Sequence, residues 1–209
     1  MDISKYRKLN EKQKSAETDP FTEKRYEQFA RHMPESANRI LDIGCSTGRG
    51  GGALKRLLPD IDLHGLDCSK ARLAKLPASY TGRHFGNVTK LPFPNERFDV
   101  VLMGEFIEHI QPKDVDSVLS ECQRVLRVGG RCMLTTPNPN CWQNRYLGRT
   151  VYTTSHLSQH FPQDLKLRLR LAGLNKIKVR GSGKFTNYAG EHFPVLGPYG
   201  SYLIYGDKI

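Results

Sequence analysis

The stretch Arg39-Ile-Leu-Asp-Ile-Gly-Cys-Ser-Thr-Gly48 decides how the rest of the sequence is interpreted. It starts with an apolar run and ends in a turn with two glycines, and residues 49–58 then have the character of a helix. A strand, a tight glycine loop and a helix start form the unit that binds nucleotides at the carboxyl end of a parallel sheet. Gly44 and Gly48 allow the backbone to turn sharply and to approach a ligand closely. The stretch therefore predicts a Rossmann-like α/β fold with a nucleotide site.

Two nucleotide-binding patterns compete in this loop. Gly48-Arg-Gly-Gly-Gly-Ala53 has the spacing G-x-G-x-x-G/A of a dinucleotide site, but that fingerprint follows its strand directly, and here the apolar run ends earlier, at Ile43. Asp42-Ile-Gly-Cys-Ser-Thr-Gly48 instead places an acid at the strand end, followed by G-x-x-x-G in register. This pattern resembles the first motif of class I S-adenosylmethionine-dependent methyltransferases, in which the position of Ser46 is often glycine. An NAD-dependent oxidoreductase that uses Gly48–Ala53 is the alternative.

The rest of the chain completes an α/β pattern around this unit. It predicts a Rossmann-like, seven-stranded, mostly parallel sheet flanked by helices, with the last strand pair antiparallel. The predicted strands span residues 39–43, 61–67, 79–88, 98–104, 131–138, 177–181 and 199–205. The predicted helices span residues 20–33, 49–58, 69–76, 113–127 and 162–172. Phe21, Arg25 and Phe29 share one face of the first helix, and we expect Gly129-Gly130 to cap the fourth.

Two segments stand apart from this alternation. Residues 1–18 are polar and charged and predict a flexible basic arm, which leaves residues 19–209 as a single domain. Residues 138–160 form a polar and aromatic stretch, and loops this long inside a compact domain are usually functional. In the methyltransferase family this stretch covers the acceptor pocket, and we expect the same role here; a surface excursion is the alternative.

The second predicted strand ends in Asp67. A carboxylate at this strand tip can accept hydrogen bonds from both hydroxyls of a ribose, in dinucleotide enzymes and in methyltransferases alike. The alternative is that Asp67 only caps the following helix, although Ser69 is also able to supply that cap. Asp67 therefore supports ribose binding without choosing between the two cofactors.

Three further motifs extend the resemblance over roughly residues 20–209. Asn87, followed by Leu91-Pro-Phe and Phe98-Asp-Val-Val, takes the place of the acid that in this family accepts from the adenine amino group. Glu108-His109 after the fourth strand and Thr136-Pro-Asn after the fifth resemble the subgroup that includes ubiquinone-biosynthesis O-methyltransferases. The resemblance implies S-adenosylmethionine as the cofactor. The residues that it implies for cofactor binding are Asp42, Gly44, Cys45, Ser46, Gly48, Asp67, Cys68, Asn87, Val88, Met103 and Glu105.

Methyl transfer from a sulfonium mainly requires that acceptor and methyl are held in line and that water is excluded. A hydroxyl acceptor also has to lose its proton, a task suited to a histidine. His109 and His156 are the candidate catalytic bases; the alternative is that either one only positions the substrate or supports the fold. His156 and His160 have the i, i+4 spacing of a metal pair, but no Cys or Asp partner stands nearby in the sequence, so no metal site is predicted.

The function that these motifs indicate is methyl transfer to a small-molecule acceptor, most simply at a hydroxyl. A methyltransferase that acts on nucleic acid, lipid or glycan is a second possibility. The tetrad N/D-P-P-Y/F of enzymes that methylate base amino groups is absent, because Thr136-Pro-Asn-Pro-Asn has no aromatic residue at its end. A third possibility is a non-catalytic domain that binds the nucleoside and a partner.

The composition restricts the classes of protein to which the chain can belong. The 209 residues are 38% hydrophobic, contain no run of about 18 apolar residues, and begin without the apolar core of a signal peptide, so no membrane span is expected. The five cysteines form no C-x-x-C pair, which favours reduced thiols and a cytoplasmic protein. The net charge of +11 predicts at most a weak, non-specific attraction to anionic surfaces. The oligomeric state is not predicted.

Overall fold

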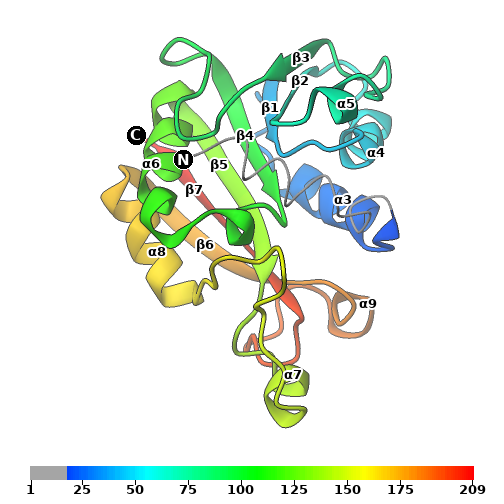
Figure 1. Cartoon of the computed structure of the whole chain (residues 1–209), viewed down its shortest axis with the longest axis vertical. Coiled ribbons are helices and arrows are strands. Elements are labelled where there is room, and N and C mark those ends of the chain that lie inside the picture. Colours follow the sequence, from blue (N-terminus) through cyan, green and yellow to red (C-terminus); the bar gives the residue numbers. More distant parts are fainter. Residues whose placement is uncertain (1–17) are drawn as a thin grey trace.

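A computed structural model describes residues 18–209 of the chain (Figure 1). The basic arm predicted at residues 1–18 lies, apart from its last residue, outside this range. In the described part of the chain, no helix is both long enough and apolar enough to cross a bilayer. All five cysteines are free thiols.

One seven-stranded sheet forms the centre of the domain, in the order β3-β2-β1-β4-β5-β7-β6. Its bounds are β1 Arg39–Ile43, β2 Asp62–Asp67, β3 Gly82–Phe85, β4 Phe98–Gly104, β5 Leu126–Pro137, β6 Leu174–Ser182 and β7 Ser201–Lys208. The first five strands pair in parallel, whereas β7 pairs antiparallel with both β5 and β6. The predicted fold class is therefore confirmed, including the antiparallel last pair.

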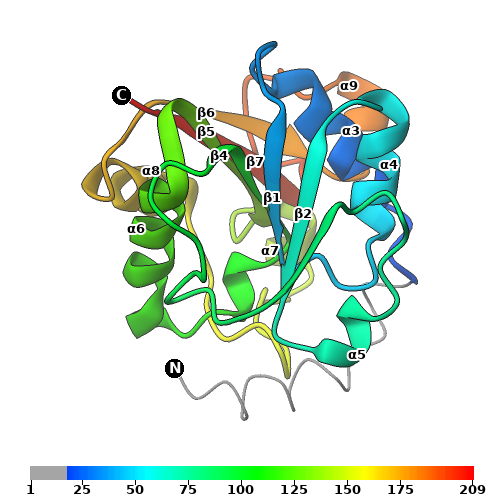
Figure 2. The same ribbon diagram turned by 90° about the horizontal axis from the view of Figure 1, so that it is seen from above.

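Helices cover both faces of the sheet, as Figure 2 shows for α3 and α4 on one side and α6 and α8 on the other. The main helices are α3 Thr22–His32, α4 Arg49–Leu57, α6 Val115–Val125 and α8 Pro162–Leu171. Shorter elements are α5 Lys70–Leu73, α7 Trp142–Tyr146, α9 Thr186–Ala189 and the 3-10 turns η1 Ile107–His109 and η2 Pro112–Asp114.

Alternate residues of each central strand face opposite layers, as expected for strands buried on both faces. Leu41 and Met103 pack into the core beneath α6 and α8. Ile40 and Leu102 pack into the core beneath α3 and α4. This alternation also decides where the polar Asp42 points, because it shares the face of Ile40.

Gly129-Gly130 do not cap a helix, contrary to the prediction. Helix α6 already ends at Val125, and β5 begins at Leu126, which is fully buried and pairs with Phe98. The pairing then shifts to Val100 with Arg131, so residues 127–130 form an irregular excursion of the strand in which Gly129 has φ +80°. A left-handed residue in such an excursion favours glycine, so Gly129 serves the irregular start of β5 rather than the end of a helix.

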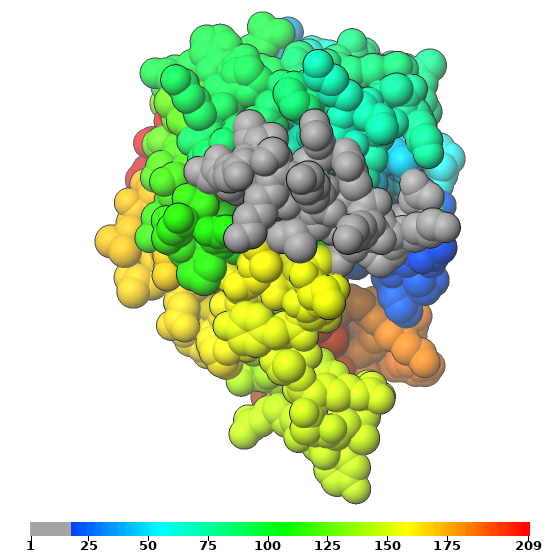
Figure 3. All heavy atoms as spheres, viewed as in Figure 1, coloured from blue at the N-terminus to red at the C-terminus, as the bar shows by residue number. Residues whose placement is uncertain are grey.

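The predicted covering segment divides into two parts. Helix α7 projects from one end of the molecule in Figures 1 and 3, away from the sheet. The later part returns to the domain, where the N–H groups of Leu157 and Ser158 both donate to the Glu108 carbonyl, at 2.8 and 3.0 Å. Only the part around residues 151–158 therefore lies against the carboxyl end of β4.

Candidate cofactor and acceptor site

A cavity of about 380 Å³ opens at the carboxyl ends of β1, β2 and β4, a size within the range of small-molecule sites. Strand β1 lies between β2 and β4. The chain therefore reverses its order of strands here, which is where open α/β sheets bind ligands. The predicted site residues that line the cavity are Gly44, Cys45, Ser46, Asp67, Cys68, Val88, Glu105, His109 and His156.

The loop after β1 has an unusual backbone. Gly44, Ser46 and Gly48 have φ values of +72°, +51° and +84°, all in the left-handed region. A Cβ on Gly44 would lie 2.3 Å from Cδ2 of Phe106, so the loop backbone and this ring are in close approach. Ser46 adopts a conformation that glycine takes at no steric cost, which explains why related motifs often have glycine at its position.

Asp67 holds this loop in place. Its two carboxylate oxygens accept hydrogen bonds from the backbone N–H groups of Ser69, at 2.8 Å, and Ser46, at 3.1 Å. The side chain of Ser69 accepts from the N–H of Arg72 and is therefore the N-cap of α5. Asp67 is only 5% exposed, and burial raises its pKa. The carboxylate has about four lone-pair positions, more than the backbone N–H groups of Ser46, Cys68 and Ser69 occupy, so it is able to accept a further hydrogen bond from a ribose.

Asp42 does not reach the cavity. It is fully buried on the face of the sheet covered by α3, where Tyr26 donates to it at 2.7 Å and Tyr80 at 2.5 Å. Burial raises the pKa of Asp42 to about 6, although both hydroxyl hydrogen bonds lower it. Asp42 thus supports the glycine loop from beneath, and the predicted direct contact with the cofactor has no support in the geometry.

Three other predicted cofactor residues also lie off the cavity. Gly48 forms the N-cap position of α4, and Met103 is fully buried in the core beneath α6. The side-chain oxygen of Asn87 accepts from the N–H of Thr89 at 3.0 Å, which closes a local turn. Its neighbours Gly86 and Val88 line the cavity instead.

The alternative dinucleotide fingerprint is explained by helix packing. Residues 49–53 form the first turns of α4, not a loop. A Cβ on Gly50 would lie 2.2 Å from the Tyr26 ring, and one on Gly51 would lie 2.0 Å from the Tyr80 hydroxyl. These two glycines are therefore required by the tyrosines that hold Asp42, with no need for a pyrophosphate.

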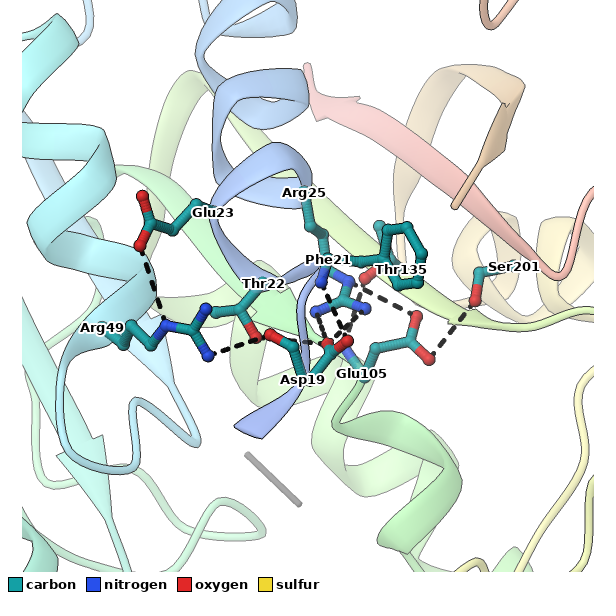
Figure 4. Close-up of polar contacts among 9 residues, drawn as sticks. All are labelled: Asp19, Phe21, Thr22, Glu23, Arg25, Arg49, Glu105, Thr135 and Ser201. Carbon is teal, nitrogen blue, oxygen red and sulfur yellow. Dashed lines mark hydrogen bonds and ion pairs between the residues drawn. The ribbon is translucent and has the colours of Figure 1, made fainter. Parts of the chain in front are cut away.

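A network of charged side chains borders the cavity and was not predicted from the sequence (Figure 4). Arg25 of α3 donates to Asp19 at 3.1 Å, and its Nε lies 3.6 Å from Oε1 of Glu105. Ser201 donates to the other oxygen of Glu105 at 3.4 Å. The Arg25 side chain is only 10% exposed. The sequence contains one indication of this network: Arg25 shares the core-facing side of the helix with Phe21 and Phe29. A charged side chain in such a position is buried only when it is paired with an opposite charge.

His109 and His156 meet at the side of the cavity formed by η1 and residues 151–158. Their rings lie 5.0 Å apart in an edge-to-face arrangement. Nδ1 of His109 donates to the Ser155 carbonyl at 2.9 Å, and Nδ1 of His156 donates to the Val151 carbonyl at 2.8 Å. Burial lowers the pKa of His109 to about 4, so its ring is neutral at physiological pH.

Glu108 completes this group and was not singled out as a site residue. It is 1% exposed, accepts from Thr136 at 3.1 Å, and has an Oε1 atom without a hydrogen-bond partner among residues 18–209. One ligand atom each of Glu108, His109 and His156 lies within 4.8 Å of the others. The pair His156 and His160 considered from the sequence does not form, because His160 is hydrogen-bonded to Ser158 at 2.8 Å.

Comparison with known proteins agrees with this geometry. Residues 41–134 match the family described as methyltransferase domain. A probable S-adenosylmethionine-dependent methyltransferase of Mycolicibacterium smegmatis is 38% identical over 104 residues, which are 47% of this chain and 38% of that protein. The ubiquinone biosynthesis O-methyltransferase of Cereibacter sphaeroides is 30% identical over 168 residues, which are 71% of this chain and 65% of that protein.

Among solved structures, an S-adenosylmethionine-dependent methyltransferase of Thermotoga maritima, described as a possible histamine N-methyltransferase, superposes with a TM-score of 0.74 at 21% identity and covers 98% of both chains. The chain thus contains a methyltransferase domain over residues 41–134 and has the fold of S-adenosylmethionine-dependent methyltransferases. It spans less than half the length of the first curated relatives that it matches.

The lining residues fit the cofactor that this family implies. Gly44 offers bare backbone to the cavity, and Asp67 offers a carboxylate with free lone pairs to a ribose. Arg25 and Glu105 provide charges of both signs, as the amino-acid part of S-adenosylmethionine requires. The residues suited to hold the cofactor therefore come from the loop after β1, the tip of β2, the end of β4 and helix α3.

Proposed function

We propose that the chain transfers the methyl group of S-adenosylmethionine to a hydroxyl oxygen of a small-molecule acceptor. The observation that carries this proposal is that one cavity is lined both by the glycine loop with Asp67 and by the pair His109 and His156. The residues suited to a nucleoside and the pair of histidines thus line the same cavity. This is the arrangement that an in-line transfer needs.

The bound cofactor supplies an electrophilic methyl group on a sulfonium. In this proposal Asp67 binds the ribose, and Arg25 with Glu105 orients the charged amino-acid end. The uncharged ring of His109 places no positive charge beside the sulfonium. Residues 151–158 lie against η1 and limit the access of water to the histidines.

The relatives support oxygen as the acceptor atom. The ubiquinone biosynthesis enzyme is named as an O-methyltransferase, and so is a fatty-acid methyltransferase of Mycolicibacterium smegmatis that is 31% identical over 60% of this chain. A C-methyltransferase of ubiquinone and menaquinone biosynthesis from Desulfotalea psychrophila, 30% identical over 49% of the chain, makes carbon the second candidate. The neighbouring histidines favour oxygen, because a hydroxyl has a proton to lose.

The test is methyl transfer from isotopically labelled S-adenosylmethionine to a panel of phenols, catechols, hydroxy acids and fatty acids, with mass spectrometry of the products. We expect a product methylated on oxygen and stoichiometric formation of S-adenosylhomocysteine. Labelling only at carbon would overturn the choice of acceptor atom. In parallel, S-adenosylhomocysteine should raise the melting temperature and NAD should not. Stabilisation by NAD alone would contradict the assignment of the cofactor.

A further inference from the structure

We propose that Glu108, His109 and His156 bind one divalent transition-metal cation beside the acceptor. The binding itself does not depend on the proposed function, whereas the role given to the cation below rests on it. Two imidazoles and one carboxylate approach one another within 4.8 Å. Such a set of donors suits first-row cations such as Zn²⁺ and Co²⁺ and is less suited to Mg²⁺, which prefers oxygen ligands.

The two histidines are oriented as metal ligands usually are. The carbonyls of Ser155 and Val151 can only accept hydrogen bonds, so Nδ1 of each ring carries the proton. In a neutral ring the lone pair then lies on Nε2. A backbone carbonyl that fixes the tautomer and the ring plane in this way is the common second shell of a metal-binding histidine.

Glu108 adds an observation that is independent of the histidines. Thr136 donates to Oε2 of its carboxyl group, while Oε1 is buried and has no hydrogen-bond partner in the described part of the chain. A buried carboxylate oxygen without a partner is costly, and a cation at this position would remove that cost. The side chain of Glu108 belongs to the same short turn as His109, so both ligands have a fixed spacing.

The third ligand, His156, belongs to the part of the covering segment that is attached to η1. Leu157 and Ser158 donate to the carbonyl of Glu108 itself, which fastens residues 151–158 to the turn that carries the other two ligands. Tetrahedral ligands at about 2.1 Å from a cation lie roughly 3.4 Å apart. The ligand atoms of the three side chains, now within 4.8 Å of one another, therefore need to approach by up to about 1.4 Å on binding. The partly exposed side chain of His156 is the one most free to move.

Three protein ligands leave coordination positions open for an acceptor hydroxyl. A hydroxyl bound to the cation releases its proton to water more readily, since the positive charge lowers its pKa. The resulting alkoxide or phenoxide oxygen forms a bond to the methyl carbon. The carbon–sulfur bond breaks, and its electron pair stays on sulfur, which becomes a neutral thioether. No oxidant or reductant takes part.

The experiment is a calorimetric titration of the full chain, freed of metal by a chelator that is then removed, with ZnCl₂ and with CoCl₂. We expect one equivalent to bind and Co²⁺ to give visible d–d bands without the near-ultraviolet thiolate band of a cysteine site. Glu108→Gln and His156→Asn should each weaken binding by at least about 10-fold. His192→Asn, which removes a histidine that is 66% exposed on its side chain and lies outside the cavity, is the matched control and should bind as the parent does.

Circular dichroism and melting curves establish that each variant is folded. Because the side chain of His156 is partly exposed, its replacement should disturb the packing of the core little. Failure of the parent chain to bind either cation would overturn the proposal, as would unchanged binding by both variants. Binding of S-adenosylhomocysteine is measured on the same samples. If it binds while the cations do not, only the metal site is refuted and the proposed methyl transfer stands.

Discussion

A hydrogen bond of 3.1 Å joins the N–H of Ser46 to the carboxylate of Asp67, so the glycine loop after β1 is fastened to the tip of β2. Two segments that both face the cavity thereby depend on one side chain. The same carboxylate accepts from the N–H of Ser69, at the start of α5. Asp67 is thus a structural residue and a candidate ligand-binding residue at once.

Replacement of Asp67 by Ala should therefore change two properties. Hydrogen bonds to charged groups contribute about 1.5–3 kcal/mol, so affinity for S-adenosylhomocysteine should fall about 10- to 150-fold. Stability should fall as well, by about 1–3 kcal/mol for each buried N–H left without an acceptor. Calorimetric titration and urea denaturation measure the two effects. An Asp67→Ala protein that is destabilised but binds S-adenosylhomocysteine normally would remove the ribose role.

Gly44→Ala should distort the loop. The new methyl group would meet the Phe106 ring at 2.3 Å, and the backbone would keep a φ of +72° that costs an L-residue about 1–2 kcal/mol. We expect a loss of stability of about 2–5 kcal/mol, since overpacking adds about 1–3 kcal/mol. Ser46→Ala is the matched control: Ser46 already has a positive φ and a buried hydroxyl without a partner among residues 18–209, so its stability should stay near that of the parent. Equal melting temperatures for Gly44→Ala and the parent would contradict the close approach of Phe106.

Asp42 should make stability depend on pH. Its pKa is raised from 3.8 to about 6 in the folded chain, so the folded state binds the proton more tightly than the unfolded state. The contribution of Asp42 is therefore most favourable below pH 3.8 and decreases as pH rises to about 6, by up to about 3 kcal/mol. Asp42→Asn should lack this decrease. Denaturation curves at pH 4.5 and 7 measure it, and the comparison with the variant removes the contributions of other groups; identical pH dependence in both proteins would show that Asp42 is not the cause.

The excess of basic residues, a net charge of +11, should give only weak binding to nucleic acid. Lys166 and Arg170 of α8 contribute to it, whereas Arg168 is paired with Asp116 at 2.6 Å. Phosphate contacts of this kind are lost as salt rises, because binding releases condensed counterions. Fluorescence anisotropy with duplexes of two unrelated sequences should give equal, low affinities at 50 mM salt and none at 200 mM. A complex that persists at the higher salt would instead favour a nucleic-acid acceptor.

The sequence was sufficient for the sheet and for the loop after β1, since both depend on local patterns. Hydrophobic runs predict the strands, and Gly44 and Gly48 mark positions that need a left-handed backbone. Asp67 at the tip of β2 was also predictable, because it ends the predicted strand in the sequence. These features depend on neighbours in the chain, which a single sequence displays.

The side-chain contacts of the site were less accessible, because each one joins distant parts of the chain. The alternation along β1 sets the face on which Asp42 lies, but the hydroxyl of Tyr80 that holds it there comes from 38 residues further along the chain. His109 and Ser155 are 46 residues apart, so their hydrogen bond has no local signal. The spacing of Arg25 with Phe21 and Phe29 indicates only a core-facing stripe of the first helix. In each case the two partners are far apart in the sequence, so only the folded structure shows that they interact.

The attachment of residues 151–158 to η1 has a consequence for the order of events during turnover. The same three hydrogen bonds that close this segment also bring His156 beside Glu108 and His109. Opening the segment to admit an acceptor would therefore take the group apart, and closing it would rebuild the group. Assembly of the acceptor site and the expulsion of solvent are then one conformational step, and the empty, open protein would be without a finished site at which water or a wrong acceptor is able to react.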